Sequence, residues 1–337
     1  MEKIPDRILL AHGGGGILMR ELIEEVVKRI GSADAPSLQD SAIVEIDGSR
    51  IAFTTDSFVV SPIFFPGGDI GTLSIYGTVN DLAVSGARPI AVSLAFIVEE
   101  GFPMESLERV ADSIRSAADR AGVSIVTGDT KVVEKGKADG IYINTSGIGV
   151  VPDGVSVSTD AAKAGDVIIV NGNIGEHGLA IASKREGIDF GVDIESDSAP
   201  LSELIIPMLE QGFAVRAMRD ATRGGLAAVL NEIASDSGVG MVVDEAQIPI
   251  PEAVLSGCEL MGYEPLNIAN EGKFVAVVDG SDAERVVEFM RSRELGRNAA
   301  LIGEVVSEHP GTVVMKTIYG GQRVVDVPYG DLLPRIC

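Results

Sequence analysis

The sequence predicts an α+β fold divided into two domains. The chain has 337 residues, and a single hydrophobic core seldom grows beyond about 250–300 residues, so two domains of ordinary size are expected. Apolar runs typical of strands alternate irregularly with amphipathic stretches typical of helices, and hairpin signals such as Asp47-Gly48 occur. This mixture favours two α+β domains over one doubly wound parallel sheet.

Periodicity places the individual elements along the chain. Apolar residues recur at the spacing of one helix face in several stretches, and short apolar runs bounded by turn-forming residues are typical of strands. Helices are expected at 17–30, 69–85, 104–121, 178–184, 201–209, 225–235, 252–261 and 283–292. Strands are expected at 42–46, 51–55, 91–98, 124–127, 141–151, 167–170, 241–243, 273–278, 301–306 and 312–316.

The domain boundary is expected at Pro152-Asp153-Gly154, where the pattern of elements breaks. The predicted parts are residues 1–152, residues 153–327 and a tail of residues 328–337. The tail has two prolines and no periodicity, so we expect it to be mobile. Fully extended, such a tail reaches roughly 33 Å, enough to carry its end from a domain edge into a cleft.

Charge and hydropathy exclude several classes of partner. The net charge of -23 repels a polyanion, so nucleic acid is not an expected partner. No stretch approaches the roughly 20 apolar residues of a membrane span, so no membrane association is expected. The segment Met1–Arg7 lacks the apolar core of a signal peptide. Together these features predict a cytoplasmic protein.

The two cysteines differ in kind. Two in a chain of this length are too few for a disulfide framework, which fits a reducing compartment. Cys258 lies in the apolar helical stretch 252–261 and is expected to be a buried packing residue. Cys337 is the last residue, and a terminal thiol has no packing reason to exist. It is therefore a candidate reactive group.

Several aspartates lie in small-residue contexts at strand ends and turns. Mg²⁺ prefers carboxylate oxygens and substrate phosphates, so these aspartates would form a magnesium–nucleotide site if the fold brought them together. Taken singly, each is more typical of a helix cap or a turn. There is no G-x-x-x-x-G-K-[ST] loop, usable G-x-G-x-x-G or H-E-x-x-H motif. The aspartates are Asp40, Asp56, Asp81, Asp129 and Asp220.

Two glycine-rich segments precede predicted helices. The run from His12 through Gly13 and Gly14 to Gly16 could offer backbone N–H groups to an anion, and a flexible loop leading into the helix is an equally good interpretation. Gly224-Gly225 opens a helix in the same way.

The order of these segments resembles a superfamily of ATP-using enzymes that includes aminoimidazole ribonucleotide synthetase, selenophosphate synthetase and thiamine-monophosphate kinase. Within it, the chain resembles the HypE family of hydrogenase maturation proteins over essentially its whole length. The combination of internal motifs with a terminal P-R-I-C is highly specific. The matching segments are His12–Gly16, Thr54–Gly71, Asn80-Asp81-Leu82, Gly128–Lys131, Asp220–Gly225 and Pro334–Cys337.

The resemblance implies a two-domain aminoimidazole ribonucleotide synthetase-like fold. The N-terminal domain would form a dimeric β-barrel in a homodimer, and the C-terminal domain an α/β sandwich. ATP would lie in a cleft between the domains. Relatives often have two acidic residues where this chain has Gln39-Asp40. By motif, Mg²⁺ would be held by Asp40, Asp56, Asp81 and Asp220, and ATP by His12, Gly13, Gly14, Gly128, Asp129, Thr130 and Lys131.

The resemblance also implies a function. A carbamoyltransferase, HypF, would place a carboxamide on the thiol of Cys337, and this chain would dehydrate it with ATP to a thiocyanate. The cyanide would pass through the HypC–HypD scaffold complex to the iron of a [NiFe] hydrogenase. Glu271 is a candidate base for the amide proton. Lys131 is a candidate to neutralise the transferring phosphate or to orient the amide.

Two other interpretations remain at this point. A related enzyme of the superfamily could phosphorylate a small molecule, although the glycine loop has no cysteine of the kind that selenide-using members carry there. A non-catalytic thiol carrier with an inherited ATP site is the second. Four separate aspartate motifs argue against the loss of activity, and a measurement of ATP hydrolysis separates the two classes.

Overall fold

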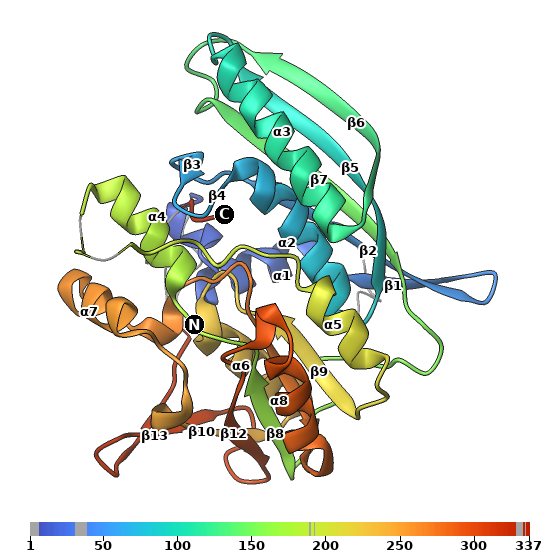
Figure 1. Cartoon of the computed structure of the whole chain (residues 1–337), viewed down its shortest axis with the longest axis vertical. Coiled ribbons are helices and arrows are strands. Elements are labelled where there is room, and N and C mark those ends of the chain that lie inside the picture. The colour runs from blue at the N-terminus through green and yellow to red at the C-terminus, as the bar shows by residue number, and fades with distance from the viewer. Residues whose placement is uncertain (1–6, 31–38, 189, 192, 328–332, 334) are drawn as a thin grey trace.

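The computed structural model describes residues 7–30, 39–188, 190–191, 193–327, 333 and 335–337. Two sheets organise the chain, one from residues before the predicted boundary and one from residues after it. Figure 1 shows the first sheet in the upper half of the molecule and the second in the lower half, with helices between and around them.

The first sheet has five strands in the order β1-β2-β7-β5-β6. Its neighbours pair antiparallel except for β5 and β6, which are parallel and are joined through a helix. The helices α2 (Ile70–Val84) and α3 (Met104–Ala121) pack with buried residues of the strands in one core. The strands are β1 (Ala42–Ile46), β2 (Ser49–Phe58), β5 (Arg88–Glu99), β6 (Ser124–Val133) and β7 (Ile141–Val150).

The second sheet has seven strands in the order β14-β13-β10-β12-β8-β11-β9. Successive residues of a strand point to opposite faces, so each face of the central strands meets a different helix layer. Val275 and Val277 pack with α6, whereas Ala276 and Val278 pack with α5 and α8. The strands are β8 (Asp166–Val170), β9 (Val215–Asp220), β10 (Gly240–Asp244), β11 (Phe274–Asp279), β12 (Ala300–Val306), β13 (Val313–Lys316) and β14 (Gln322–Val324).

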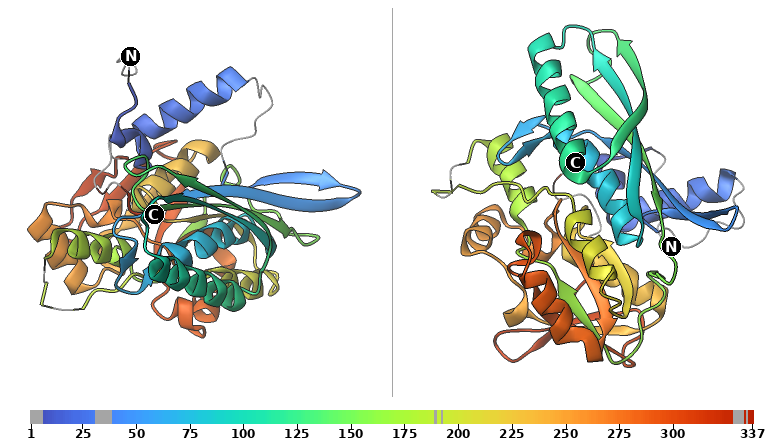
Figure 2. Two further views of the ribbon diagram at one scale, coloured as in Figure 1. Left: turned by 90° about the horizontal axis from the view of Figure 1, so that it is seen from above. Right: turned by 45° about the vertical axis from the view of Figure 1, so that its right-hand side comes forward.

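The remaining elements complete the two halves. Helix α1 (Ile17–Ile30) and the β1–β2 hairpin project from the body in the left view of Figure 2. A two-stranded sheet of β3 (Phe64–Phe65) and β4 (Gly68–Asp69) precedes α2. The other helices are α4 (Glu176–Glu186), α5 (Ser202–Leu209), α6 (Gly225–Ser237), α7 (Glu252–Met261) and α8 (Ala283–Arg291). Short 3₁₀ turns lie at Leu10–Gly13, Glu245–Gln247, Pro265–Asn267, Gly280–Asp282 and Glu294–Gly296.

The two halves are joined by a buried asparagine and by a shared core. The Asn80 amide on α2 donates to the carbonyl oxygens of Ala199 and Glu271, both at 3.1 Å, and accepts from the Leu201 N–H at 2.7 Å. Buried residues of α2 and α3 also pack in one cluster with α4 and α7. The neighbour of Asn80 in the chain, Asp81, is thereby held at the junction of the two halves.

No closed barrel is formed by the described residues of one chain. The five-stranded sheet is open, with β1 and β6 at its edges. Such a barrel could close only with strands from elsewhere, because two edge strands of one open sheet remain unpaired with each other. Of the predicted tail, residues 328–332 and 334 lie outside the described residues, and its mobility stays a prediction.

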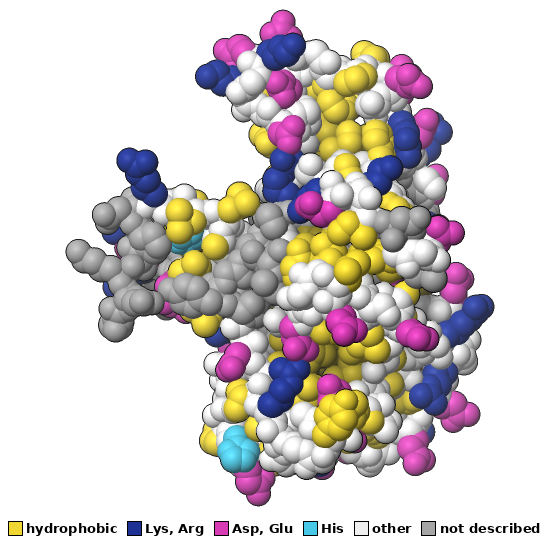
Figure 3. Space-filling model, turned by 90° about the vertical axis from the view of Figure 1, so that its left-hand side faces the viewer, with side chains coloured by type: hydrophobic (Ala, Val, Ile, Leu, Met, Phe, Trp, Pro, Cys, Tyr) yellow, Lys and Arg dark blue, Asp and Glu magenta, His cyan; other side chains and the backbone are white. Residues whose placement is uncertain are grey.

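Surface features add little to the functional argument. Among the described residues, no helix is both long enough and apolar enough to cross a membrane. Figure 3 shows acidic and basic side chains interspersed over one face of the molecule. Most of the exposed ion pairs, such as Arg88 with Glu210, contribute little to stability, since water screens them.

Candidate active site

One cavity of about 690 Å³ lies between the two halves of the chain. Residues of α1, β2 and α2 contribute to it from the first half. The end of β9, the following turn and α6 contribute from the second half, and so does the last residue of the chain. Such a cavity is large enough for a nucleotide-sized ligand.

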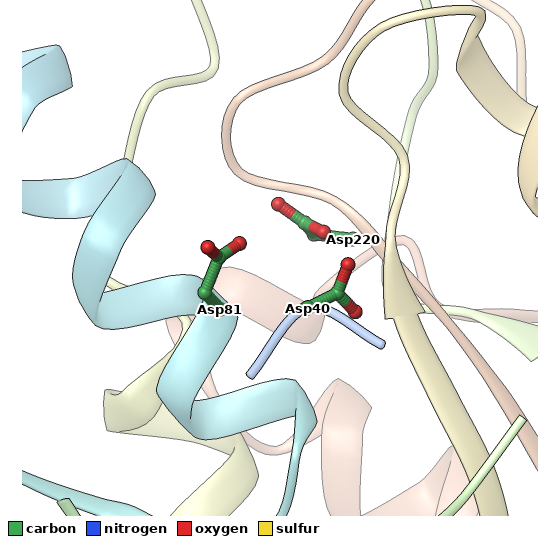
Figure 4. A group of neighbouring side chains, drawn as sticks. All are labelled: Asp40, Asp81 and Asp220. Atoms are coloured by element: carbon green, nitrogen blue, oxygen red, sulfur yellow. The ribbon is translucent and has the colours of Figure 1, made fainter. Parts of the chain in front are cut away.

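Three aspartates converge in this cavity from separate parts of the sequence. Carboxylate oxygens of Asp40, Asp81 and Asp220 all lie within 4.8 Å of one another. Figure 4 shows the three side chains turned toward one another: Asp40 from the segment before β1, Asp81 from α2 and Asp220 from the end of β9. Asp56, on β2, also lines the cavity.

Neighbouring polar groups hold the cluster in place. The Thr54 hydroxyl lies 2.7 Å from Oδ2 of Asp81 and 2.9 Å from the carbonyl oxygen of Asp40. The Ser41 hydroxyl donates to the carbonyl oxygen of Asp81 at 3.1 Å. Gln39 bonds outside the cluster, since its amide donates to the hydroxyls of Ser158 and Thr159. At the sequence position where relatives often have two acidic residues, Asp40 is therefore the one that supplies a carboxylate to the cluster.

Burial is the largest cause that disfavours the charged forms of the four carboxyls, and repulsion between aspartates adds to it at Asp40, Asp81 and Asp220. Burial raises the pKa of Asp40 to about 6, against an opposing effect of Arg219. Burial and then the neighbouring aspartates raise the pKa values of Asp81 and Asp220 well above normal. Burial also raises the pKa of Asp56. A divalent cation would stabilise the charged carboxylates of such a cluster and could take the place of their protons.

Arg219 offsets part of this negative charge. Its Nε lies 3.1 Å from Oδ1 of Asp40 and 3.1 Å from Oε2 of Glu232 on α6. Partly or fully buried carboxyls from three parts of the chain fit a hard divalent cation, which takes oxygen ligands. The donor set contains no sulfur or imidazole, so it does not fit a soft metal.

The two glycine-rich segments meet at the edge of the cavity. Gly15 has a φ of 75°, and a Cβ there would lie 2.6 Å from the carbonyl oxygen of Arg223. Gly15 and Gly16 line the cavity just before α1, whereas His12, Gly13 and Gly14 are outside its lining. The His12 ring instead caps its own turn, where Nδ1 lies 3.0 Å from the backbone nitrogen of Leu9.

Glu271 lines the same cavity and is almost completely buried. Its side chain is 2% exposed, and Oε1 has no hydrogen-bond partner among the described residues. Burial, followed by the charges of Asp220 and Asp197, raises the pKa of Glu271 well above normal. A buried carboxyl oxygen without a partner costs free energy, so an incoming N–H donor would stabilise this group.

The last residue of the chain also lines the cavity. A main-chain oxygen of Cys337 accepts from the Val59 N–H at 2.9 Å, and Ile336 is buried in the core shared by the two halves. The negative charge of Cys337 is the largest effect that raises the pKa of Arg223, a partly buried residue three positions after Asp220. The structure therefore brings Cys337, Glu271 and the aspartates into one pocket.

Gly128, Asp129, Thr130 and Lys131 lie elsewhere. They continue strand β6 beyond the predicted end at Thr127, with exposed side chains, and none of them lines the cavity. Lys131 Nζ lies 2.8 Å from Oδ2 of Asp129, and the two side chains are 68% and 63% exposed. Within one chain, this segment does not reach the aspartates.

Two arginines that line the cavity were given no role from the sequence. Arg219 and Arg223 flank Asp220 in the motif Arg-Asp-Ala-Thr-Arg, and both line the cavity. Cations beside a predicted acidic phosphate site were an available signal, because phosphates and carboxylates both attract guanidinium groups.

The comparisons with known proteins agree on a family. The model of "AIR synthase related protein, N-terminal domain" matches residues 38–151, and that of "AIR synthase related protein, C-terminal domain" matches residues 163–316. Carbamoyl dehydratase HypE of Rhizobium leguminosarum bv. viciae is 51% identical over 333 residues, which cover 98% of this chain and 95% of that protein.

Solved structures give the same result. A HypE–HypF complex contains a chain that is 49% identical with a TM-score of 0.87, and the match covers 91% of this chain and 99% of that one. HypE in complex with ATP is 43% identical with a TM-score of 0.84, covering 98% of this chain and all of that one, 100%.

These matches define the class as a two-domain protein of the AIR synthase type with mixed α/β content. More narrowly, the chain belongs to the HypE family of hydrogenase maturation proteins and is a carbamoyl dehydratase.

Proposed function

We propose that the cavity dehydrates a carboxamide carried on the Sγ of Cys337, in an ATP-dependent reaction that leaves a thiocyanate. The observation that carries the proposal is the position of Cys337, which lines the same cavity as Glu271 and the four aspartates. The relative whose structure holds ATP supports ATP as the second substrate. The role of ATP follows from the chemistry, since an amide oxygen is a poor leaving group.

The atoms balance in two steps without a change of oxidation state. In the first step, the carboxamide oxygen bonds to the terminal phosphorus of ATP, ADP leaves, and the nitrogen loses one proton, giving S–C(OPO₃)=NH. In the second step, the nitrogen loses its other proton, the C–O bond breaks, and inorganic phosphate leaves S–C≡N. Positioning and charge neutralisation supply most of such catalysis.

The residues of the cavity divide this work. Asp40, Asp56, Asp81 and Asp220 would hold Mg²⁺, which supplies neutralisation of phosphate charge when it is bound. Arg223, which lines the cavity with Cys337, stays protonated and holds positive charge near the end of the chain. Glu271 accepts a hydrogen bond from the carboxamide nitrogen and then its proton. Its raised pKa makes it a strong base once it is ionised.

The partners extend the proposal. The complex of a HypE relative with HypF supports HypF as the carbamoyl donor for Cys337. The cyanide group then passes to a HypC–HypD complex and on to the iron of a [NiFe] hydrogenase. Two cysteines that take part in no disulfide are compatible with a reducing cytoplasm.

A homodimer is the second part of the proposal. The strands of the first sheet expose large apolar side chains, among them Phe53, Ile97, Ile125 and Ile148, and this is the kind of surface that pairing would cover. A second copy at β6 could close the predicted barrel and could bring Gly128–Lys131 to a nucleotide bound in the other chain's cavity. In a single chain, that segment lies outside the cavity.

Intact-mass spectrometry tests the proposed reaction. After reaction with the carbamoyl donor, the protein should gain one carboxamide, and magnesium–ATP should then remove one water from it. Cys337→Ala should abolish both changes, whereas Cys258→Ala should preserve them, because Cys258 is buried in α7. A loss of water that persists in Cys337→Ala, or no loss in the unmodified sequence, would contradict the proposal.

A further inference from the structure

The last residues of the chain are held through their main-chain oxygen atoms. Cys337 accepts from the Val59 N–H at 2.9 Å, and Arg335 accepts from the Ser61 N–H at 3.2 Å. These two bonds run in the antiparallel sense, since the partner number falls from 337 to 335 as the first rises from 59 to 61. In Figure 1 the C-terminus lies between the two halves, beside β3 and β4.

Between these two bonds, a histidine of α4 meets the remaining carbonyl. Nε2 of His177 lies 2.9 Å from the carbonyl oxygen of Ile336. Because a carbonyl oxygen can only accept, Nε2 must carry the proton, and in a neutral ring Nδ1 is then an acceptor. Nδ1 lies 2.8 Å from the Ser196 hydroxyl, which accepts in turn from the Ser198 N–H at 3.1 Å.

The surroundings hold this ring in one state. His177 is completely buried, with the edge of Phe65 against it at 5.6 Å between ring centres. Burial lowers the pKa of His177, so the imidazole is neutral and its single proton points to the tail. The carbonyl of Ile336 fixes the tautomer, because it can only accept, and the Ser196 hydroxyl then donates to Nδ1.

An arginine of the same helix bridges the tail and its neighbouring segment. Nη2 of Arg185 donates to the carbonyl oxygen of Arg335 at 2.8 Å and to that of Ser61 at 2.6 Å, and Nε also donates to Ser61 at 2.9 Å. His177 and Arg185 lie about two helical turns apart on α4, so they face the same side. Together they contact two successive carbonyls of the tail.

We propose that His177 and Arg185 are positioning residues that form a catch on α4 for the end of the chain. The catch holds Cys337 in the cavity, and its release frees the thiol. This inference deepens and rests on the proposed function, since a cysteine that is loaded by a partner and processed in the cavity must occupy both states. The contacts that define the catch run to the main-chain carbonyls of Ile336 and Arg335, one and two residues before Cys337. Because these carbonyls are unchanged when the sulfur is loaded, the catch should hold the thiol, the carboxamide and the cyanide forms alike.

Thiol labelling measures the catch without any enzymatic step. A maleimide linked to a polymer too bulky for the cavity reacts with Cys337 only when the tail is out. The buried Cys258 in the same chain reports whether the core has opened. His177→Leu and Arg185→Met each remove donors from a carbonyl, so labelling of Cys337 should rise roughly tenfold in each.

Matched variants separate the catch from a general loss of structure. His177→Gln keeps an N–H donor near the position of Nε2 and should restore slow labelling. Lys184→Met changes the exposed neighbour of Arg185 and should leave labelling unchanged. The proposal is overturned if Cys337 labelling stays at the original rate in both donor-removing variants. It is also overturned if Lys184→Met raises labelling equally, or if Cys258 becomes labelled in step with Cys337.

A second readout connects the catch to the reaction. The fraction of docked tail follows from the labelling rates, and across the single variants and the double variant the rate of water loss from carbamoylated Cys337 should fall in proportion to it. Loading by the carbamoyl donor, which needs the released tail, should not slow. If the rate of water loss does not follow the docked fraction, the catch is contradicted but the proposed function is not. If the unmodified sequence loses no water, the proposed function fails, and labelling still decides the catch.

Discussion

The acidic wall of the cavity and strand β6 hold their carboxylates in opposite environments. Asp81 and Asp220 are enclosed beside like charges, and their pKa values are raised well above normal. Asp129 on β6 is exposed, and a hydrogen bond from Lys131 lowers its pKa. The charge of Asp129 is balanced by Lys131, whereas Asp81 and Asp220 face further negative charges. The difference indicates that a bound cation would be stabilised more by the carboxylates of the cavity than by Asp129. Strand β6 could contact a nucleotide only if a second chain brought a cavity to it.

The largest expected effect comes from removing carboxylates of the cavity. Asp81→Asn and Asp220→Asn should each lower ATP-dependent water loss roughly a hundredfold or more, since each removes a proposed Mg²⁺ ligand. In the absence of metal, both should raise the melting temperature by relieving repulsion. Asp129→Asn is the control and should change neither Mg²⁺ affinity nor melting temperature. Equal losses of Mg²⁺ affinity in all three variants would erase the contrast between the two regions.

The next largest expected effect is a loss of folding stability when the Arg219 guanidinium is removed. Arg219 is 17% exposed and faces both Asp40 and Glu232. Arg219→Met leaves these carboxylates without a buried partner and should cost about 3–5 kcal/mol in the free energy of unfolding, measured in urea. Arg88→Met, which breaks an exposed pair, should cost less than about 1 kcal/mol. Similar costs for the two variants would contradict the assigned role of the buried pair.

The pH dependence of stability should report the same cluster. Asp40 has a folded-state pKa of about 6, above the value of about 3.9 in an unfolded chain. Between these values the folded state binds more protons, so the free energy of unfolding falls as the pH rises through this window. Mg²⁺ should therefore raise the melting temperature more at about pH 8 than at about pH 5. A stabilisation by Mg²⁺ that does not vary with pH would argue against these carboxyls as ligands.

The smallest expected effect on folding is at Lys131. Its side chain is 68% exposed, so Lys131→Ala should leave the melting temperature unchanged. If the dimer brings it to the other chain's cavity, water loss should slow roughly tenfold or more. Mixing Lys131→Ala with Asp81→Asn chains should then restore one intact site per mixed dimer. If mixed dimers regain no activity, Lys131 on β6 does not contribute to the other chain's active site.

Local sequence pattern was sufficient for several elements. The bounds predicted for α1 and α3, at 17–30 and 104–121, coincide with the structure because each has a continuous apolar face and α3 ends at Gly122 in the left-handed conformation. Strand β9 was missed, since Arg216 and Arg219 interrupt its apolar pattern. Each arginine is tolerated there only because distant carboxylates pair with it, and a local pattern does not contain that information.

The site was predictable in kind but not in arrangement. Asp40, Asp81 and Asp220 were named individually, yet their convergence depends on the Asn80 link between the two halves and on the position of β9. Glu271 reads as a turn residue, and only the fold encloses it. The role of α4 was invisible for the same reason, since His177 meets the tail 159 positions later in the chain.

The most direct test of the account follows one oxygen atom. Carbamoylated Cys337 is prepared with heavy oxygen in the carboxamide and treated with magnesium–ATP, and the phosphate is analysed by mass spectrometry. If the amide oxygen is phosphorylated in the cavity, the heavy oxygen should appear in inorganic phosphate, one atom for each thiocyanate formed. Heavy oxygen in water, with unlabelled phosphate, would contradict the account.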